Sequence, residues 1–282
     1  MLKNSILYRV FLLFLRIFIL LCRIFSLERR DVHLNVNILE LHKKFLNISS
    51  MGWIKSLRSG STGVGYTFES LIDKVEDTLS LPDFKGIEIK THRKNSKSHV
   101  SLFNCNPSGN DSYELKRIFD SYCYYNPTKK IKSLNTSVYC DCIIDVGIHY
   151  KFSLKVDREQ CKVFLRVFDR LGYFIEESSY WSFDVLREKL YSKMSYLAVV
   201  QADSKFCGKA EYFKYTNIRF YKIKSFDSFI KLLENGKIRV TFTVSGYSNP
   251  EMANKIKNHG TSFNISFDDI SLLYDCIDIS NI

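Results

Sequence analysis

The stretch 81–90, LPDFKGIEIK, contains the residues of this chain best suited to catalysis. Asp83 lies five residues before Glu88, and Lys90 follows Glu88 by two residues. Alternate residues of a strand point to one face, so we expect Glu88 and Lys90 to share a face with Asp83 at the strand entry. Two carboxylates and an ammonium that converge there suit a divalent metal ion and a water molecule that attacks a phosphodiester. The spacing alone is equally compatible with a solvated strand face.

The neighbouring segments are expected to position this stretch. Upstream lies a glycine-rich loop that is either a flexible connector or a backbone that approaches a phosphate closely. Its glycines are Gly60, Gly63 and Gly65. Hydrophobic periodicity predicts a helix over residues 66–79, with Glu69 in its first turn. Downstream, a hairpin is predicted, with a basic tip at residues 91–99 and a returning strand at residues 100–103.

The composition predicts a packed globular protein. Of 282 residues, 45% are hydrophobic and 15% are aromatic, which excludes a disordered chain. Lysine and arginine number 41 against 30 aspartates and glutamates, giving a net charge of +11. This balance favours a polyanion or an anionic membrane surface as partner, although solubility alone also explains it.

The cysteines show no metal-binding pattern. Eight are scattered along the chain, without a CxxC pair or the Cys/His spacing of a zinc site. We therefore expect reduced, mostly buried thiols in a cytoplasmic protein.

The N-terminal segment, residues 1–35, is expected to lie outside the globular fold as a hydrophobic and basic leader. Its residues 5–25 are long enough to span a bilayer. However, Arg9, Arg16 and Arg23 recur every seven residues on one helical face, and a central Arg costs about 2.5–3.5 kcal/mol on insertion. A membrane span, an interfacial helix and an appended leader all remain open.

The remaining pattern predicts an α/β fold that is β-rich in its second half. We expect a catalytic lobe over residues 36–135 and a β-rich lobe over residues 136–282. Helices are predicted over 37–46, 113–124 and 183–194, with a further helix capped by Ser225 and a short one from Asp268. Strands are predicted over 138–145, 149–156, 161–168, 196–202, 211–223, 237–244 and, as the last strand, 259–266.

Four ordered segments resemble the MvaI/BcnI family of type II restriction endonucleases. They are GWIKSLRSG at residues 52–60, TGVGYTFE at 62–69, LPDFKGIEIK at 81–90 and HGTSF at 259–263. The resemblance runs from about residue 36 to the end, and the family is similar to the MutH mismatch-repair nicking enzymes and the wider PD-(D/E)xK nucleases. It implies a restriction-endonuclease-like mixed β-sheet core flanked by helices, with a β-rich lobe for DNA recognition.

The resemblance also implies roles for the residues of the site. Asp83 and Glu88 would ligate Mg²⁺ with help from the Ile89 carbonyl. Lys90 would orient or activate the attacking water and stabilise negative charge on the phosphorane. Glu69 would be the helix-borne acid that contacts a second metal ion or orders water. Crowding of the carboxylates is expected to raise the pKa of one of them.

DNA contacts are expected from both lobes, which would clasp double-stranded DNA as a monomer. The candidates for base readout are His92 and His259, with Arg219 and Arg239 as weaker candidates. The candidates for backbone contacts are Lys55, Arg58 and Arg93. A solvated strand face also explains Arg219 and Arg239, and a strand-capping role also explains His259.

The resemblance implies a Mg²⁺-dependent endonuclease that hydrolyses double-stranded DNA at a short specific site. A cognate DNA methyltransferase is expected as a genetic rather than a physical partner. Two alternatives remain: a MutH-like nicking endonuclease of mismatch repair, and a catalytically silent DNA-binding or membrane-tethered module.

Overall fold

The structure, a computed structural model, describes residues 33–282 except 73–80, 95, 97, 111, 141 and 253. The predicted leader, including its three regularly spaced arginines, therefore lies outside the described residues apart from residues 33–35. Among the described helices, none combines the length and the apolar character that a membrane crossing needs.

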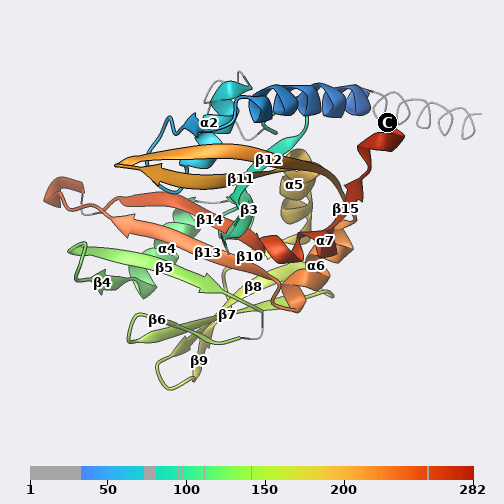
Figure 1. The fold of residues 1–282 in the computed structure, drawn as a ribbon. Helices are drawn as coiled ribbons and strands as arrows, with labels where there is room; N and C mark the ends of the chain where they lie inside the picture. Colours follow the sequence, from blue (N-terminus) through green and yellow to red (C-terminus); the bar gives the residue numbers. More distant parts are fainter. Residues whose placement is uncertain are drawn as a thin grey trace, which may run out of the picture.

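The described strands form three five-stranded sheets, stacked as layers in Figure 1. The first sheet has the order β1 (Ile54–Lys55), β12 (Ala210–Ile223), β11 (Tyr196–Cys207) and β2 (Glu88–Arg93), with β15 (Tyr274–Ile277) paired to β12. The second has the order β3 (His99–Asn104), β14 (Ile256–Ser266), β13 (Ile238–Gly246), β5 (Ile131–Val138) and β4 (Tyr124–Asn126). The third has the order β10 (Tyr180–Ser182), β8 (Lys162–Asp169), β7 (Tyr150–Asp157) and β6 (Ile144–Val146), with β9 (Phe174–Glu176) paired to β8.

The first sheet is mixed, because β2 runs parallel to β11 while the other pairs are antiparallel. Helices flank the layers: residues 33–50, α2 (Gly63–Leu71), α3 (Pro107–Asn110), α4 (Ser112–Tyr122), α5 (Phe183–Met194), α6 (Phe226–Glu234) and α7 (Ile270–Leu273). This arrangement confirms the predicted α/β class with a mixed sheet core.

Two N-terminal helices cover one face of the first sheet (Figure 1). The helix of residues 33–50 buries Ile38, Leu41 and Phe45, and α2 buries Phe68. These side chains pack in one core with alternate residues of β11 and with β12 residues such as Tyr215. Opposite residues of β11 enter a second, larger core that the other sheets share. The paired parts of β11 and β2 are thus covered on both faces, as is usual for parallel strands, whereas one face of β12 stays exposed.

The predicted glycine loop was partly wrong, because α2 begins at Gly63 and contains Gly65. A Cβ atom on Gly63 would lie 2.3 Å from the Arg58 carbonyl oxygen, so this position requires glycine. The glycine therefore permits a close approach between the preceding loop and the helix, instead of making the loop flexible. The predicted end of this helix falls in residues 73–80, outside the described residues.

The predicted hairpin of residues 88–103 was wrong. β2 pairs with β11 in the first sheet, whereas β3 pairs with β14 in the second. Residues 86–90 and 99–102 alternate in polarity, but alternation fixes which face is buried and does not choose the partner strand. Strands of the first and second sheets come from both sides of residue 135, so that boundary separates neither sheet from the others.

Most of the strongly periodic elements were predicted well. α5 spans Phe183–Met194 as expected, and the Ser225 hydroxyl accepts from the Ser228 N–H at the start of α6. The predicted meander is confirmed in β6, β7 and β8. β15 follows β14, so the predicted last strand is not the last.

The cysteine prediction was half right. All described cysteines are free thiols. However, only Cys105 and Cys140 are buried, while four are exposed. The exposed ones are Cys142, Cys161, Cys207 and Cys276.

Candidate active site

Strand β2 sorts its side chains as the alternation predicts. Ile87 and Ile89 are buried in the core beneath the N-terminal helices. Glu88 and Lys90 lie on the opposite face, where the Lys90 ammonium donates to Glu88 Oε1 at 2.5 Å. The expected pairing of these two side chains on one face is therefore present.

A tight turn brings Asp83 to the same strand. Phe84 and Ile87 exchange backbone hydrogen bonds of 2.9 and 2.8 Å, and both residues between them have positive φ, 45° at Lys85 and 90° at Gly86. A two-residue hairpin turn of this kind requires positive φ angles at both central residues, and Gly86 adopts such an angle without strain. The turn lets Asp83 Oδ2 accept a 2.9 Å hydrogen bond from the Ile89 N–H.

Glu88 is the most buried charged group of the site, with 1% of its side chain exposed. Burial raises its pKa above the ordinary value; Lys90 opposes this shift and the negative charge of Asp83 adds to it. The expected rise of one carboxylate pKa is thus present, although burial is its main cause. Glu88 Oε2 is buried and makes no hydrogen bond within the described residues.

The buried Glu88 Oε2, which has no hydrogen-bond donor within the described residues, indicates that the site fits a metal ion. A buried carboxylate oxygen without a donor is costly unless a cation takes it. Carboxylate and carbonyl oxygens are the ligands that Mg²⁺ prefers, and Mg²⁺ retains several waters. Among the described residues no three His, Cys, Asp or Glu side chains gather as a metal site. A site in which Asp83, Glu88 and several water molecules are the ligands fits Mg²⁺, because it offers oxygen ligands and needs fewer than three acidic side chains.

Glu69 reaches this region from α2. It lines a cavity of about 310 Å³ together with Arg58 and Lys90. Arg58 lies on the loop before α2, and its guanidinium carbon stacks 3.7 Å from the centre of the Tyr66 ring. The structure therefore places the predicted helix-borne acid and one predicted backbone contact beside Lys90.

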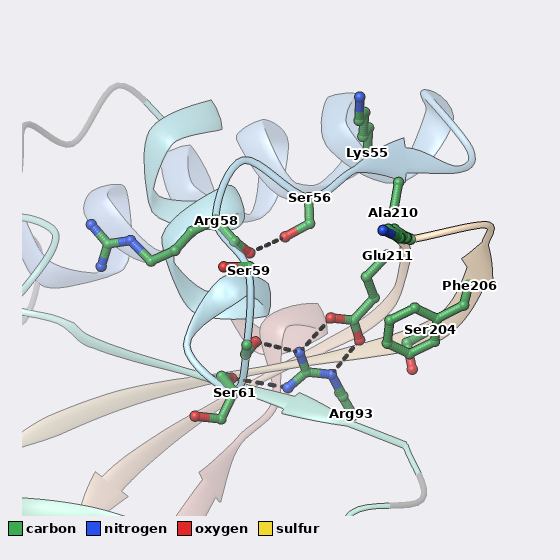
Figure 2. Close-up of a pocket in the computed structure, with 12 residues that line it drawn as sticks. Lys55, Ser56, Arg58, Ser59, Ser61, Arg93, Ser204, Phe206, Ala210 and Glu211 are labelled. Carbon is green, nitrogen blue, oxygen red and sulfur yellow. Dashed lines mark hydrogen bonds and ion pairs between the residues drawn. The ribbon is translucent and has the colours of Figure 1, made fainter.

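A larger cavity of about 790 Å³ lies on the other side of the loop that carries Arg58 (Figure 2). Lys55 and Arg93, both expected at the DNA backbone, line it. Lys55 is exposed on β1. Arg93 is engaged inside the protein, with a double ion pair to Glu211 and bonds to the Gly60 and Ser61 carbonyls. Its predicted contact with the DNA backbone stays a prediction, because this structure shows only its contacts within the protein.

His92 is not in a basic tip but in strand β2, where only 6% of it is exposed. Its ring stacks on Phe267 with centres 3.8 Å apart, and burial lowers its pKa. A ring covered in this way offers almost no surface to a base edge, so the structure does not favour its predicted role in base readout.

The other predicted base readers lie on the first and second sheets. His259 is exposed on β14 and lines a cavity of about 420 Å³ with polar side chains of β5 and β13, including Asn135 and Thr241. Arg219 is exposed on β12. Arg239 is partly covered on β13 and donates to the Tyr139 hydroxyl at 3.2 Å.

Two residues at these sites were not anticipated from the sequence. Lys193 Nζ, near the end of α5, lies 3.4 Å from Glu88 Oε1. Glu211 holds Arg93 from 118 residues away. No local pattern indicates either contact, because each depends on how separate elements pack.

The fold is a mixed sheet flanked by helices, and its edge strand and the turn before it carry an acid–acid–lysine set. These features place the protein in the class of restriction-endonuclease-like nucleases. The chain belongs to the MvaI/BcnI restriction endonuclease family, whose pattern matches residues 42–274. This family membership supports a site-specific DNA endonuclease.

Solved structures agree with this assignment. A complex of restriction endonuclease MvaI with cognate DNA is 31% identical with a TM-score of 0.77, covering 86% of this chain and 98% of that one. MvaI without DNA is 30% identical with a TM-score of 0.57, covering 86% and 96%. No curated protein matches the chain.

Proposed function

We propose that this protein is a type II restriction endonuclease that hydrolyses double-stranded DNA at a short specific site with Mg²⁺. The observation that carries the proposal is the site on β2. Asp83 is bonded to the Ile89 N–H, and Lys90 to one oxygen of Glu88, while the other oxygen is buried without a donor. The similarity to a restriction endonuclease in complex with its cognate DNA supports double-stranded DNA as the substrate.

Each residue of the site has a defined task in this proposal. Asp83 and Glu88 Oε2 hold the metal ion, and the Ile89 carbonyl is a third candidate ligand. When bound, Mg²⁺ polarises the scissile phosphate and lowers the pKa of a water molecule. Lys90, fixed by Glu88, orients the attacking water and places positive charge near the phosphate oxygens. Glu69 orders water in the neighbouring cavity.

DNA binding is assigned to residues around the two lobes. Lys55 and Arg58 contact the phosphate backbone, which positions the duplex without reading it. His259 reads base edges from its polar cavity, and Arg219 is a weaker candidate because it stands on an exposed strand face. The protein acts as a monomer, and a cognate methyltransferase protects the host site.

The test is cleavage of a supercoiled plasmid of known sequence over a range of Mg²⁺ concentrations. We expect discrete fragments whose ends map to one short sequence. Asp83→Asn and Glu88→Gln should abolish cleavage, because each removes a charge from the metal site. Asp145→Asn is the matched control, since Asp145 is 76% exposed on β6 and pairs only with Lys151 in the described residues.

The products also separate the alternatives. Open circles without linear DNA would identify a nicking enzyme. Duplex binding without cleavage at any Mg²⁺ concentration would identify a catalytically silent DNA-binding module. Cleavage by Asp83→Asn at the wild-type rate would refute the assigned site while leaving a nuclease elsewhere in the chain.

A further inference from the structure

The loop of residues 56–62 forms the wall between the two cavities beside the active site. Arg58 and Ser61 line both the 310 Å³ cavity with Glu69 and Lys90 and the 790 Å³ cavity on the other side. Figure 2 shows the Arg58 guanidinium directed away from Arg93, across the loop. The position of this short wall therefore determines where Arg58 stands relative to Lys90.

A charged pair from the first sheet holds the wall in place (Figure 2). Arg93, the last residue of β2, donates to the Ser61 carbonyl at 2.9 Å and to the Gly60 carbonyl at 3.2 Å. The same guanidinium donates to both carboxylate oxygens of Glu211, at 2.8 and 3.0 Å. One planar group thus connects β2, β12 and the loop.

Glu211 also fixes the start of the wall. Its backbone carbonyl accepts a 2.8 Å hydrogen bond from the Ser56 N–H. The Ser56 hydroxyl in turn donates to the Arg58 carbonyl at 2.6 Å. The wall is therefore tied at both ends to the same residue of β12, directly at one end and through Arg93 at the other.

The pair is shielded from water more than a surface ion pair. Exposed fractions are 23% for the Arg93 side chain and 10% for that of Glu211. Fork-shaped bonds between arginine and a carboxylate fix orientation as well as distance. A lysine in place of Arg93 keeps the charge but cannot form four bonds in these directions.

We propose that Arg93 and Glu211 are a positioning pair that holds residues 56–62 so that Arg58 meets the DNA backbone beside Lys90. The inference rests on the proposed function, because DNA is the ligand that Arg58 would contact. It assigns to Arg93 and Glu211 no contact with DNA of their own.

Glu211→Gln separates this role from a direct one, because the two roles predict opposite signs. Removing a negative charge near a polyanion tightens binding by general electrostatics. Loss of the positioning pair instead weakens it. We expect Glu211→Gln to bind a mixed-sequence duplex of about 30 base pairs about fivefold or more weakly than the wild type does. The affinity is measured in EDTA by fluorescence anisotropy. Unchanged or tighter binding would overturn the proposal.

The chain offers a matched control for this substitution. Arg158 and Glu234 form a similar double ion pair, with bonds of 2.6 and 2.7 Å, between the turn after β7 and α6. Glu234→Gln removes the same charge from the same kind of pair away from the active site. It should not weaken duplex binding. A loss equal to that of Glu211→Gln would show a general effect on stability, since the charge change alone tightens binding, and it would refute the positioning role.

A double-mutant cycle tests the link to Arg58. Arg58→Ala should weaken duplex binding, and adding Arg93→Lys to Arg58→Ala should weaken it little further, because both changes remove the same contact. Additive losses would mean that Arg93 acts on DNA independently, which would contradict the proposal.

Hydrogen exchange in the free protein distinguishes failure of this inference from failure of the proposed function. The amides of Ser56, Leu57 and Gly63, which are hydrogen-bonded at the two ends of the loop, should exchange at least about tenfold faster in Arg93→Lys than in the wild type, without DNA present. Unchanged exchange would overturn the positioning role. If exchange rises as expected but the wild type binds no duplex, the pair holds the loop and the proposed DNA function is what fails.

Discussion

Asp83 and Ile89 are linked by a 2.9 Å hydrogen bond in which the backbone N–H of Ile89 donates to the Asp83 carboxylate. This bond sets the distance between the turn that carries one acid and the strand that carries the other. Because Ile89 is flanked by Glu88 and Lys90, one backbone group fixes Asp83 relative to both of these site residues. The acid–acid–lysine set is thus one local unit, formed within ten residues of the chain.

Lys90→Met should separate catalysis from DNA binding. We expect cleavage to fall by about 10²–10³-fold, because a preorganised positive charge near the phosphate is lost. Duplex affinity in EDTA should change much less, since Lys90 is engaged with Glu88 before DNA arrives. Single-turnover cleavage and anisotropy measure the two effects. Lys151→Met on β7 is the control, and equal losses in cleavage and binding would contradict the assigned role.

Glu88→Gln should abolish cleavage yet stabilise the metal-free protein. Folded Glu88 has a raised pKa, so the native state keeps its proton to higher pH than the unfolded state. Wild-type stability therefore falls as pH rises through the range above the ordinary value of 4.5. In EDTA the variant should have a higher Tm than the wild type at pH 7. This difference in Tm should disappear near pH 4, where the Glu88 carboxyl is protonated in both the folded and the unfolded wild type.

Mg²⁺ should reverse that order by binding only the wild type. A ligand that binds the native state raises Tm as its concentration exceeds Kd. We expect Mg²⁺ to raise the Tm of the wild type and to leave that of Glu88→Gln unchanged, measured by scanning calorimetry. An equal rise in both proteins would argue against Glu88 as a metal ligand.

His92 should make the fold sensitive to mild acid. Burial lowers its pKa below the ordinary value of 6.5, so unfolding takes up a proton just below that pH. Stability is therefore fully present above pH 6.5 and is lost as pH falls. His92→Phe keeps a ring against Phe267 but has no proton to bind. Urea unfolding between pH 7 and 5.5 should show a smaller loss for the variant, and an equal loss would contradict this account.

His259→Ala should relax sequence preference more than it weakens binding. A good contact to a base edge contributes about 1–3 kcal/mol of discrimination against the wrong base. We expect the ratio of cleavage at the mapped site to cleavage at single-base variants to fall by about tenfold or more. Lys55→Ala, a backbone contact in this scheme, should lower cleavage of all sequences alike. A uniform loss for His259→Ala would assign it to the backbone instead.

Features that depend only on neighbouring residues could be predicted from the amino-acid order. Alternation placed Ile87 and Ile89 in the core and Glu88 with Lys90 on the other face, and the spacing brought Asp83 to the strand entry. Helical periodicity likewise located α5, and a serine cap located α6. These signals are local, because a side-chain direction follows from backbone geometry alone.

Strand pairing and the contacts between distant charges, by contrast, depend on how the whole chain packs. β2 joins β11 rather than β3, and this choice buries His92 on Phe267 and turns Arg93 towards Glu211. Lys193 reaches Glu88 because α5 packs against the same face of the sheet. Such contacts join residues that are far apart in the sequence, 118 positions for Arg93 and Glu211, and they follow from shape and burial across layers rather than from any pattern within one segment.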